Sequence, residues 1–220
     1  MDRDAAELDP ALAAGSFSQW LAGAVLAVRD GAESDVPCGG CTACCESSQF
    51  VHIEPDETDV LAHVPAELLV PAPGLPRGHV LLGYDEDGRC PMLVDGRCSI
   101  YAHRPRTCRT YDCRIFPAAG VEPDPDQPAI AAQVARWRFD HPSDGDRAEH
   151  RAVRTAATVI AAHPDIVDAE HAPASATRLA VQAVALHDLF AGIDAEHAQL
   201  ELESVAVEIS RRRGRSRQSE

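Results

Sequence analysis

Apolar residues recur at helical spacing near both ends of the chain. After Ser16, a residue type that caps helices, apolar side chains recur at helical spacing: Trp20, Leu21, Ala24, Val25 and Val28. The same period returns beyond Asp146. The sequence therefore predicts helices over residues 3–14, 16–29, 146–163, 174–191 and 194–211.

The middle of the chain instead holds short apolar segments separated by Pro and Gly. Asp95-Gly96 lies between two such segments and is a strong signal for a two-residue hairpin turn. The pattern predicts strands over 50–53 and 79–84, a helix over 55–64, a hairpin of 92–94 with 97–101, and a short helix from Pro105 that carries Cys108. Residues 117–128 contain four prolines and three acids, which favours an exposed loop. Residues 130–139 fit either a strand or a helix.

Charge and length narrow the class of protein. The formal net charge of −15 argues against general nucleic-acid binding, which requires cations that neutralise phosphates. The apolar run Trp20 to Val28 is about half as long as a membrane span, and the N-terminus lacks a basic signal region. We therefore expect a cytoplasmic protein without membrane or nucleic-acid partners, in a compartment that keeps thiols reduced.

All eight cysteines fall into two stretches, four in each. The first reads C-x2-C-x2-C-C, and C-x2-C spacing lets two sulfurs converge on one ion from a single turn. Because adjacent side chains point in different directions, the last cysteine of this motif should reach a different ion or a different atom of one cluster. Eight thiols could fill two four-coordinate sites or one multinuclear site with spare residues. The predicted metal ligands are Cys38, Cys41, Cys44, Cys45, Cys90, Cys98, Cys108 and Cys113.

Other residues near the cysteines could support the metal. The backbone N–H groups of Gly39 and Gly40 can point inward from the loop. Arginines are concentrated between residues 97 and 114. Arg104 and Arg109 are candidates for holding a negatively charged thiolate–metal group. Ordinary ion pairing with the acidic surface explains these arginines equally well. Tyr101 and Tyr111 could keep water out of the site. One of three histidines, His52, His79 or His103, could replace a thiolate.

These observations predict an α+β fold in which a small cysteine-rich metal-binding core with short strands is flanked by N-terminal helices and a C-terminal helical segment. The predicted domains are an N-terminal helical segment (1–36), a cysteine-cluster metal-binding domain (37–145), a C-terminal helical extension (146–211) and a basic disordered tail (212–220).

The two cysteine stretches resemble the YkgJ-type CxxCxxCC cysteine-cluster family, whose members are described as chelating zinc or iron. The first stretch, CGGCTACC, carries the family's opening motif. The later motifs are C-P-x-L, C-x-I-Y, R-P-x-x-C-R and a final cysteine, and they begin here at Cys90, Cys98, Arg104 and Cys113. The resemblance covers residues 38–113 and implies metal chelation without a settled activity. A related cysteine pattern occurs in the flagellin lysine methylase, an iron–sulfur protein, but no methyl-donor site maps onto this sequence.

Three hypotheses follow. The first is a metal-binding protein that holds an iron–sulfur cluster, the preferred cofactor, or zinc, with a redox or electron-transfer role. The second is a metal-dependent protein-modifying enzyme, an oxidoreductase or a methyltransferase-like protein, with Asp112, His103 or Tyr111 as candidate non-ligand groups. The third is a zinc-stapled interaction module that binds a protein partner through its C-terminal helices.

Overall fold

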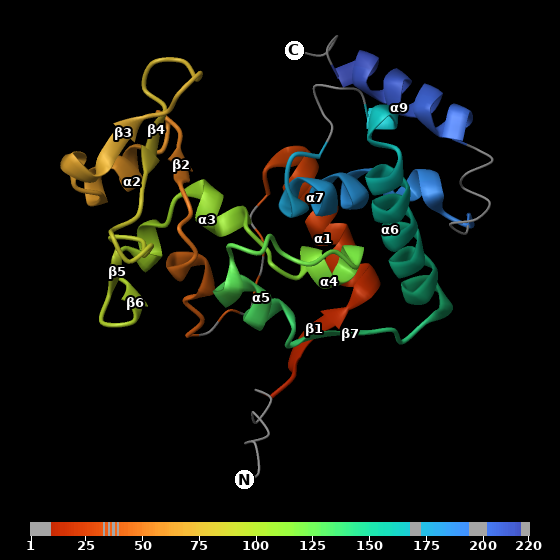
Figure 1. The fold of residues 1–220 in the computed structure, drawn as a ribbon, viewed down its shortest axis with the longest axis horizontal. Coiled ribbons are helices and arrows are strands. Elements are labelled where there is room, and N and C mark those ends of the chain that lie inside the picture. The colour runs from red at the N-terminus through yellow and green to blue at the C-terminus, as the bar shows by residue number, and fades with distance from the viewer. Residues whose placement is uncertain are drawn as a thin grey trace. The chain divides into compact units, whose positions relative to one another are not determined.

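Short strands in the middle of the chain and helices toward its ends give a mixed α+β fold, as the sequence predicts (Figure 1). The computed structural model describes residues 10–32, 34, 36, 38, 40–167, 173–193 and 202–216, with side chains up to residue 211. The chain divides into two units. The cysteine unit comprises Gly23–Cys113 and Pro123–Ala131, and the helical unit comprises the described parts of Met1–Ala22, Arg114–Glu122 and Ala132–Glu220.

The cysteine unit is built on a three-stranded antiparallel sheet. Its strands are β2 (Val51–Ile53), β3 (Leu69–Pro71) and β4 (Val80–Leu82), in the order β2-β4-β3. The helix α2 (Thr58–His63) packs on this sheet (Figure 1). Together they bury a small apolar core: Val51, Ile53, Val60, Val64, Leu82, Met92 and Ile100.

The cysteine-bearing segments surround this core. A hairpin of β5 (Leu93–Val94) and β6 (Arg97–Cys98) turns at Asp95 and Gly96, whose φ angles are +50° and +69°. Positive φ at both central residues is the turn type that matches the twist of a hairpin, so the sequence prediction is confirmed. The remaining segments are the 3₁₀ turns η1 (Ala43–Glu46), η2 (Ala66–Leu68) and η3 (Tyr101–His103), and the short helix α3 (Arg106–Thr110).

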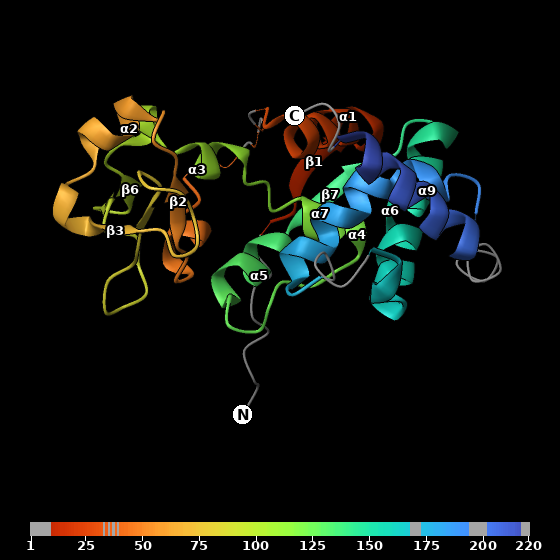
Figure 2. The ribbon, with the colours of Figure 1, turned by 90° about the horizontal axis from the view of Figure 1, so that it is seen from above.

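The helical unit has a core of large apolar side chains. It contains β1 (Leu12–Ser16), paired in parallel with β7 (Trp137–Asp140), and helices that pack together as Figure 2 shows. The fully buried side chains include Phe17, Phe116 and Phe190. The helices and 3₁₀ turns of this unit are α4 (Ile115–Ala119), α6 (Asp144–Ala162), η4 (Pro164–Val167), α7 (Ala176–Leu186), η5 (His187–Phe190) and α9 (Leu202–Ser216). The helices α1 (Phe17–Asp30) and α5 (Pro128–Val134) each have residues in both units.

The N-terminus of α6 is fixed by a buried carboxylate. Ser143 and Asp146 form a capping box, which satisfies backbone N–H groups that the helix leaves free. Asp146 also accepts hydrogen bonds from the Ser16 hydroxyl at 2.7 Å and the Ser18 backbone N–H at 3.0 Å. These bonds hold the pKa of Asp146 well below its ordinary value. They tie the start of α1 to the start of α6 within this unit.

Two sequence predictions are wrong in part. Residues 12–14 of the predicted helix 3–14 lie in β1, because pairing with β7 satisfies the same backbone groups, and residues 3–9 lie outside the described residues. The predicted loop 117–128 contains the end of α4, and Pro128 opens α5. A proline needs no N–H partner in the first turn of a helix, so Pro117 and Pro128 are accommodated there.

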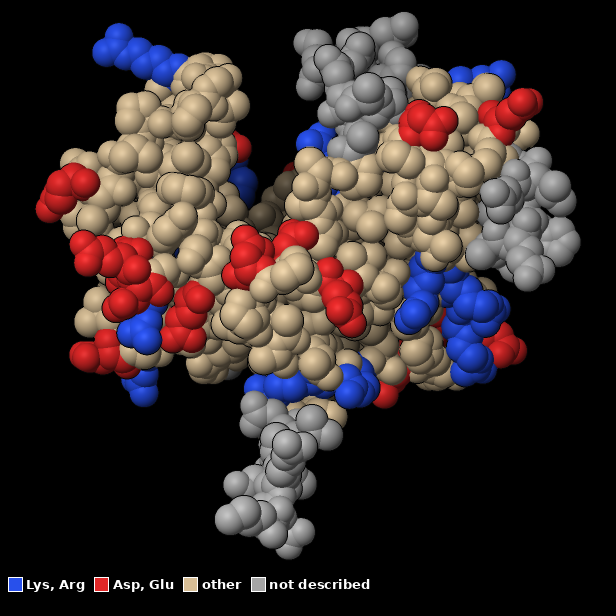
Figure 3. All heavy atoms as spheres, in the orientation of Figure 1, with Lys and Arg blue, Asp and Glu red and all other residues tan. Residues whose placement is uncertain are grey.

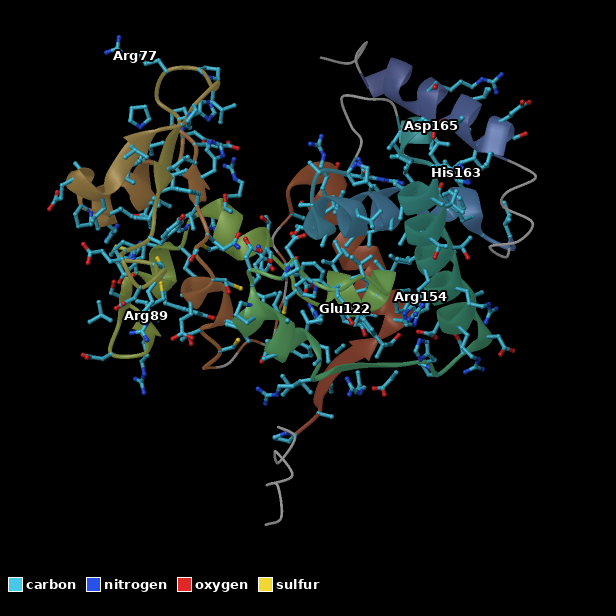
Figure 4. All side chains as sticks on the ribbon, viewed as in Figure 1. Arg77, Arg89, Glu122, Arg154, His163 and Asp165 are labelled. Carbon is cyan, nitrogen blue, oxygen red and sulfur yellow. The ribbon has the colours of Figure 1, made fainter. Side chains whose placement is uncertain are left out.

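Gly120 ends α4 in a left-handed conformation with φ +67°. A Cβ atom there would stand 2.9 Å from the guanidinium of Arg154, which reaches from α6 toward α4 (Figure 4). The positive φ favours glycine at this position, whereas the guanidinium, the end of a flexible side chain, could move away from a Cβ atom.

The other predicted elements agree with the structure to within a few residues. Residues 130–139, which fitted a strand or a helix, contain the end of α5 and then β7. The predicted helix 194–211 is present from Leu202 and continues to Ser216, whereas 194–201 and 217–220 lie outside the described residues. No pattern in the sequence predicted the strand β3. The predicted domain boundaries stay a prediction.

No helix in the described part of the chain combines the length and the apolar character that crossing a bilayer requires.

Candidate metal centre

The first cysteine motif is a tight loop that leads into η1. The Cys41 N–H donates to the Cys38 carbonyl at 2.9 Å, and the Cys45 N–H donates to the Thr42 carbonyl at 2.8 Å. Cys44 and Cys45 both lie on the 3₁₀ turn η1. Because a 3₁₀ helix has about three residues per turn, adjacent side chains on it point about 120° apart. The two neighbouring thiols therefore face different surroundings.

The second cysteine stretch is joined to the first by main-chain hydrogen bonds. The Cys90 N–H donates to the Cys45 carbonyl at 2.7 Å, and the Ser48 N–H donates to the Gly88 carbonyl at 2.9 Å. Cys98 lies opposite Leu93 across the β5–β6 hairpin. Two segments separated by some forty residues are thus brought together by pairing of their backbones, and Figure 4 shows sulfur atoms among the elements of this unit.

Four thiols form what we name the first thiol group: Cys38, Cys41, Cys44 and Cys113. Cys44 is exposed as a residue, yet desolvation of its thiol raises its pKa well above the ordinary value. The charges that raise this pKa further belong, in order, to Cys113, Cys38 and Cys41, and only then to its sequence neighbour Cys45. Cys44 therefore lies near the last cysteine of the chain as well as near the two that precede it in its motif.

The other four form the second thiol group: Cys45, Cys90, Cys98 and Cys108. Burial and then the charges of Cys90 and Cys98 raise the pKa of Cys45 to about 11. Burial and then the charges of Cys45, Cys90 and Cys98 raise the pKa of Cys108 to about 12. Each of these thiols thus responds first to members of its own group.

The backbone around Cys90 supplies hydrogen bonds to its sulfur. The N–H groups of Met92 and Leu93 donate to this sulfur and lower its pKa, although burial, the largest effect, raises the pKa overall. N–H donors of this kind stabilise thiolates and tune bound metals. The sequence motif C-P-x-L signals the segment, but the donors are visible only in the structure.

Tyr111 lies beside the first thiol group. Burial, followed by the charges of Cys44 and Cys113, raises the pKa of its hydroxyl. This hydroxyl is buried and has no hydrogen-bond partner among the described residues. A buried hydroxyl normally finds an acceptor, and a thiolate or sulfide in the first group would supply one. The surroundings of Tyr111 therefore fit a negatively charged thiolate–metal group.

All eight cysteines are free thiols, with Cys113 the most deeply buried. Ionising four clustered thiols without a cation is unfavourable, and the raised pKa values express this cost. A bound metal removes the mutual repulsion, because it ligates the deprotonated form. The donor set is the one that zinc and iron–sulfur clusters use.

Only some of the supporting residues predicted from the sequence lie near the cysteines. Gly39 lies outside the described residues, and Gly40 is exposed in the turn before Cys41. The guanidinium of Arg104 stacks on the Tyr101 ring at 3.8 Å, and its charge lowers the pKa of Cys108. Arg109 lies on the same short helix as Cys108 and lines a surface pocket. Tyr101 is 57% exposed, so it does not cover a site as expected.

Neighbouring arginines and histidines have other partners. Arg106 pairs with Glu54 and Asp56, and Arg114, in the helical unit, donates to the Ala14 carbonyl at 3.2 Å. Ion pairing with acids, the ordinary explanation of the arginines, thus applies to Arg106. Among the histidines proposed to replace a thiolate, the rings of His52 and His79 hydrogen bond to each other at 3.0 Å, and His103 bonds to Asp59 at 2.6 Å.

Residues 37–123 match the family model CxxCxxCC, described as "Putative zinc- or iron-chelating domain". The match includes all eight cysteines and extends over less than half of the chain. Searches of curated proteins and of solved structures found no match. Residues 37–123 are therefore similar to the CxxCxxCC domain, in agreement with the resemblance seen in the sequence.

Proposed function

We propose that the CxxCxxCC domain binds metal at two neighbouring centres, one for each thiol group. The observation that carries this proposal is the different setting of Cys44 and Cys45, which lie side by side in the chain but are surrounded by different thiols. Four cysteines complete a coordination set for one zinc ion or one iron–sulfur cluster. The first centre would use Cys38, Cys41, Cys44 and Cys113, and the second Cys45, Cys90, Cys98 and Cys108.

An iron–sulfur cluster is the content we propose, with zinc as the alternative. Four sulfurs around one zinc ion at about 2.3 Å stand about 3.8 Å from one another. In the described part of the chain, no three cysteine sulfurs all lie within 4.8 Å of one another. A multinuclear cluster holds its thiolates on different iron atoms and so farther apart, which favours iron–sulfur.

A bound cluster would supply one-electron chemistry, and the protein would set its potential. The N–H groups of Met92 and Leu93 aim at the sulfur of the second group, and the Tyr111 hydroxyl lies beside the first. Donors to thiolate sulfur raise the potential of such centres, and burial lowers it. The function this supports best is electron transfer or redox sensing, in the reducing cytoplasm that keeps the thiols available for the metal.

The test compares Cys44→Ser with its neighbour Cys45→Ser in protein purified without oxygen, with iron, zinc and inorganic sulfide measured for each. Each variant should lose the metal of one group and keep most of the metal of the other. The double variant should lose both. Loss of nearly all the metal in either single variant would show that the eight thiols serve one site and would overturn the division.

The same protein preparations show whether the bound metal is an iron–sulfur cluster or zinc. Brown protein with visible charge-transfer absorption and stoichiometric sulfide supports the cluster. Colourless protein with two zinc ions per chain replaces it by a structural zinc module, whose removal should unfold the cysteine unit. In that case we propose protein binding through the C-terminal helices, where Val207 of α9 is 52% exposed. A nucleic-acid partner is disfavoured because acidic side chains gather over the viewed face around the β5–β6 hairpin (Figure 3).

A further inference from the structure

A second kind of metal donor set lies on the surface of the cysteine unit, apart from the cysteines. One ligand atom from each of Asp59, His63 and His103 lies within 4.8 Å of the other two. Asp59 and His63 are one turn apart on α2, so their side chains share a face of this helix. His103 comes from the end of η3.

The two imidazoles are arranged as a pair. The rings of His63 and His103 are stacked with centroids 3.6 Å apart and an interplanar angle of 8°. The Asp59 carboxylate lies 2.6 Å from Nδ1 of His103 and 3.7 Å from Nδ1 of His63. The Asp59 carboxylate thus faces Nδ1 of both histidines, and Nδ1 of His63 also lies 2.7 Å from the Asp59 backbone carbonyl.

We propose that Asp59, His63 and His103 bind a divalent first-row transition metal ion. Two imidazoles and one carboxylate are the donors that zinc, nickel and iron(II) accept, in contrast to the soft sulfurs of the thiol groups. An ion between the three side chains takes the place of the proton that Asp59 and His103 share. Metal–nitrogen and metal–oxygen distances of about 2.0–2.2 Å place tetrahedral ligand atoms about 3.4 Å apart, between the 2.6 Å and 3.7 Å that separate the Asp59 carboxylate from the two Nδ1 atoms.

The surroundings leave room for an exchangeable ion. Asp59 and His103 line an open surface pocket of about 210 Å³, which can hold the remaining water ligands. Two of the arginines on the pocket wall contact other side chains: Arg106 pairs with Glu54 and Asp56, and Arg104 stacks on Tyr101. The side chains of His63 and His103 are 41% and 37% exposed, so they can adjust to the ion and release it to solvent. The site should therefore bind more weakly than the thiol groups.

The experiment uses the full chain with its thiols first saturated with Zn²⁺. Further Zn²⁺ is added while calorimetry measures the stoichiometry and long-range ¹H–¹⁵N spectra follow the imidazole nitrogens. One additional equivalent should bind, and the ring signals of His63 and His103 should shift. His63→Ala and the isosteric Asp59→Asn should each weaken this binding about 10-fold to 100-fold.

His79→Ala is the matched control, because it removes a paired imidazole of the same unit that lies outside the cluster. This variant should bind the additional Zn²⁺ like the parent. Absence of a further equivalent, unmoved His63 and His103 signals, or equal binding by Asp59→Asn would each overturn the proposal. The imidazole signals report this site whether or not the thiols hold metal, so the outcome is separate from that of the proposed function.

Discussion

The reactivity of Cys45 toward an alkylating reagent tests whether the second thiol group is assembled before metal binds. Only the thiolate reacts, so the rate of modification by iodoacetamide follows the fraction ionised. An ordinary thiol with a pKa of 9.0 is about half ionised at pH 9. With its pKa raised to about 11, Cys45 should be about 1% ionised at that pH.

The raised pKa of Cys45 determines how its rate of alkylation changes with pH. Below about pH 11 the neutral thiol predominates, so each additional pH unit should increase the rate about tenfold. The rate of an ordinary thiol levels off above about pH 9. Between pH 8 and pH 10 the Cys45 profile should therefore keep rising where that of the same cysteine in urea flattens.

The assay is mass spectrometry of metal-free, reduced protein modified for short times across this pH range. Restricted access of the reagent slows modification at every pH, whereas the pKa, which burial and then the charges of Cys90 and Cys98 raise, changes the shape of the profile. Cys90→Ser removes the neighbour with the largest charge effect on Cys45 and should move the profile to lower pH. A native profile that levels off near pH 9 would refute the assembled group.

Three further predictions concern the framework of the two units, each measured by urea unfolding. Leu82→Ala empties a fully buried core position and should lower the free energy of unfolding of the cysteine unit by about 2–5 kcal/mol, whereas Val70→Ala on the exposed face of β3 should change it little. Gly120→Ala forces a left-handed residue and should cost about 1–2 kcal/mol, whereas Gly23→Ala inside α1 should stabilise by about 0.5–1 kcal/mol. Burial lowers the pKa of His150 from 6.5 to about 4, so its contribution to the free energy of unfolding is full above pH 6.5 and is lost as the pH falls toward 4. Replacing His150 should therefore make the free energy of unfolding less sensitive to acid in this range, and an unchanged sensitivity would contradict the prediction.

The motif chemistry and the hairpin could be read from the sequence because they depend on local geometry. Asp95-Gly96 adopts the two positive φ angles that its residue types favour. Cys44 and Cys45 diverge because adjacent residues do so on any regular backbone. Such features need no knowledge of distant partners.

Features that depend on a partner far away in sequence escaped prediction. β1 forms because Leu12–Ser16 pairs with Trp137–Asp140, and this pairing overrides a local helical period. The Asp59–His63–His103 cluster has a partial signal, the spacing of four residues within α2, but its third member arrives from η3. No local sequence pattern predicts the β1–β7 pairing or the approach of His103 to α2.

The same distinction applies to the proposed division of the eight cysteines. Spacing alone would group the four thiols of C-x2-C-x2-C-C around one centre, because they are the nearest in sequence. The short turn η1 prevents this, since it sends Cys45 away from Cys44, and the bond from the Cys90 N–H to the Cys45 carbonyl then brings the hairpin cysteines to Cys45. In the proposed division, Cys113 takes the fourth position beside Cys44, whose pKa its charge raises. The vicinal cysteine pair is then the element of the proposal that makes two neighbouring centres out of one motif.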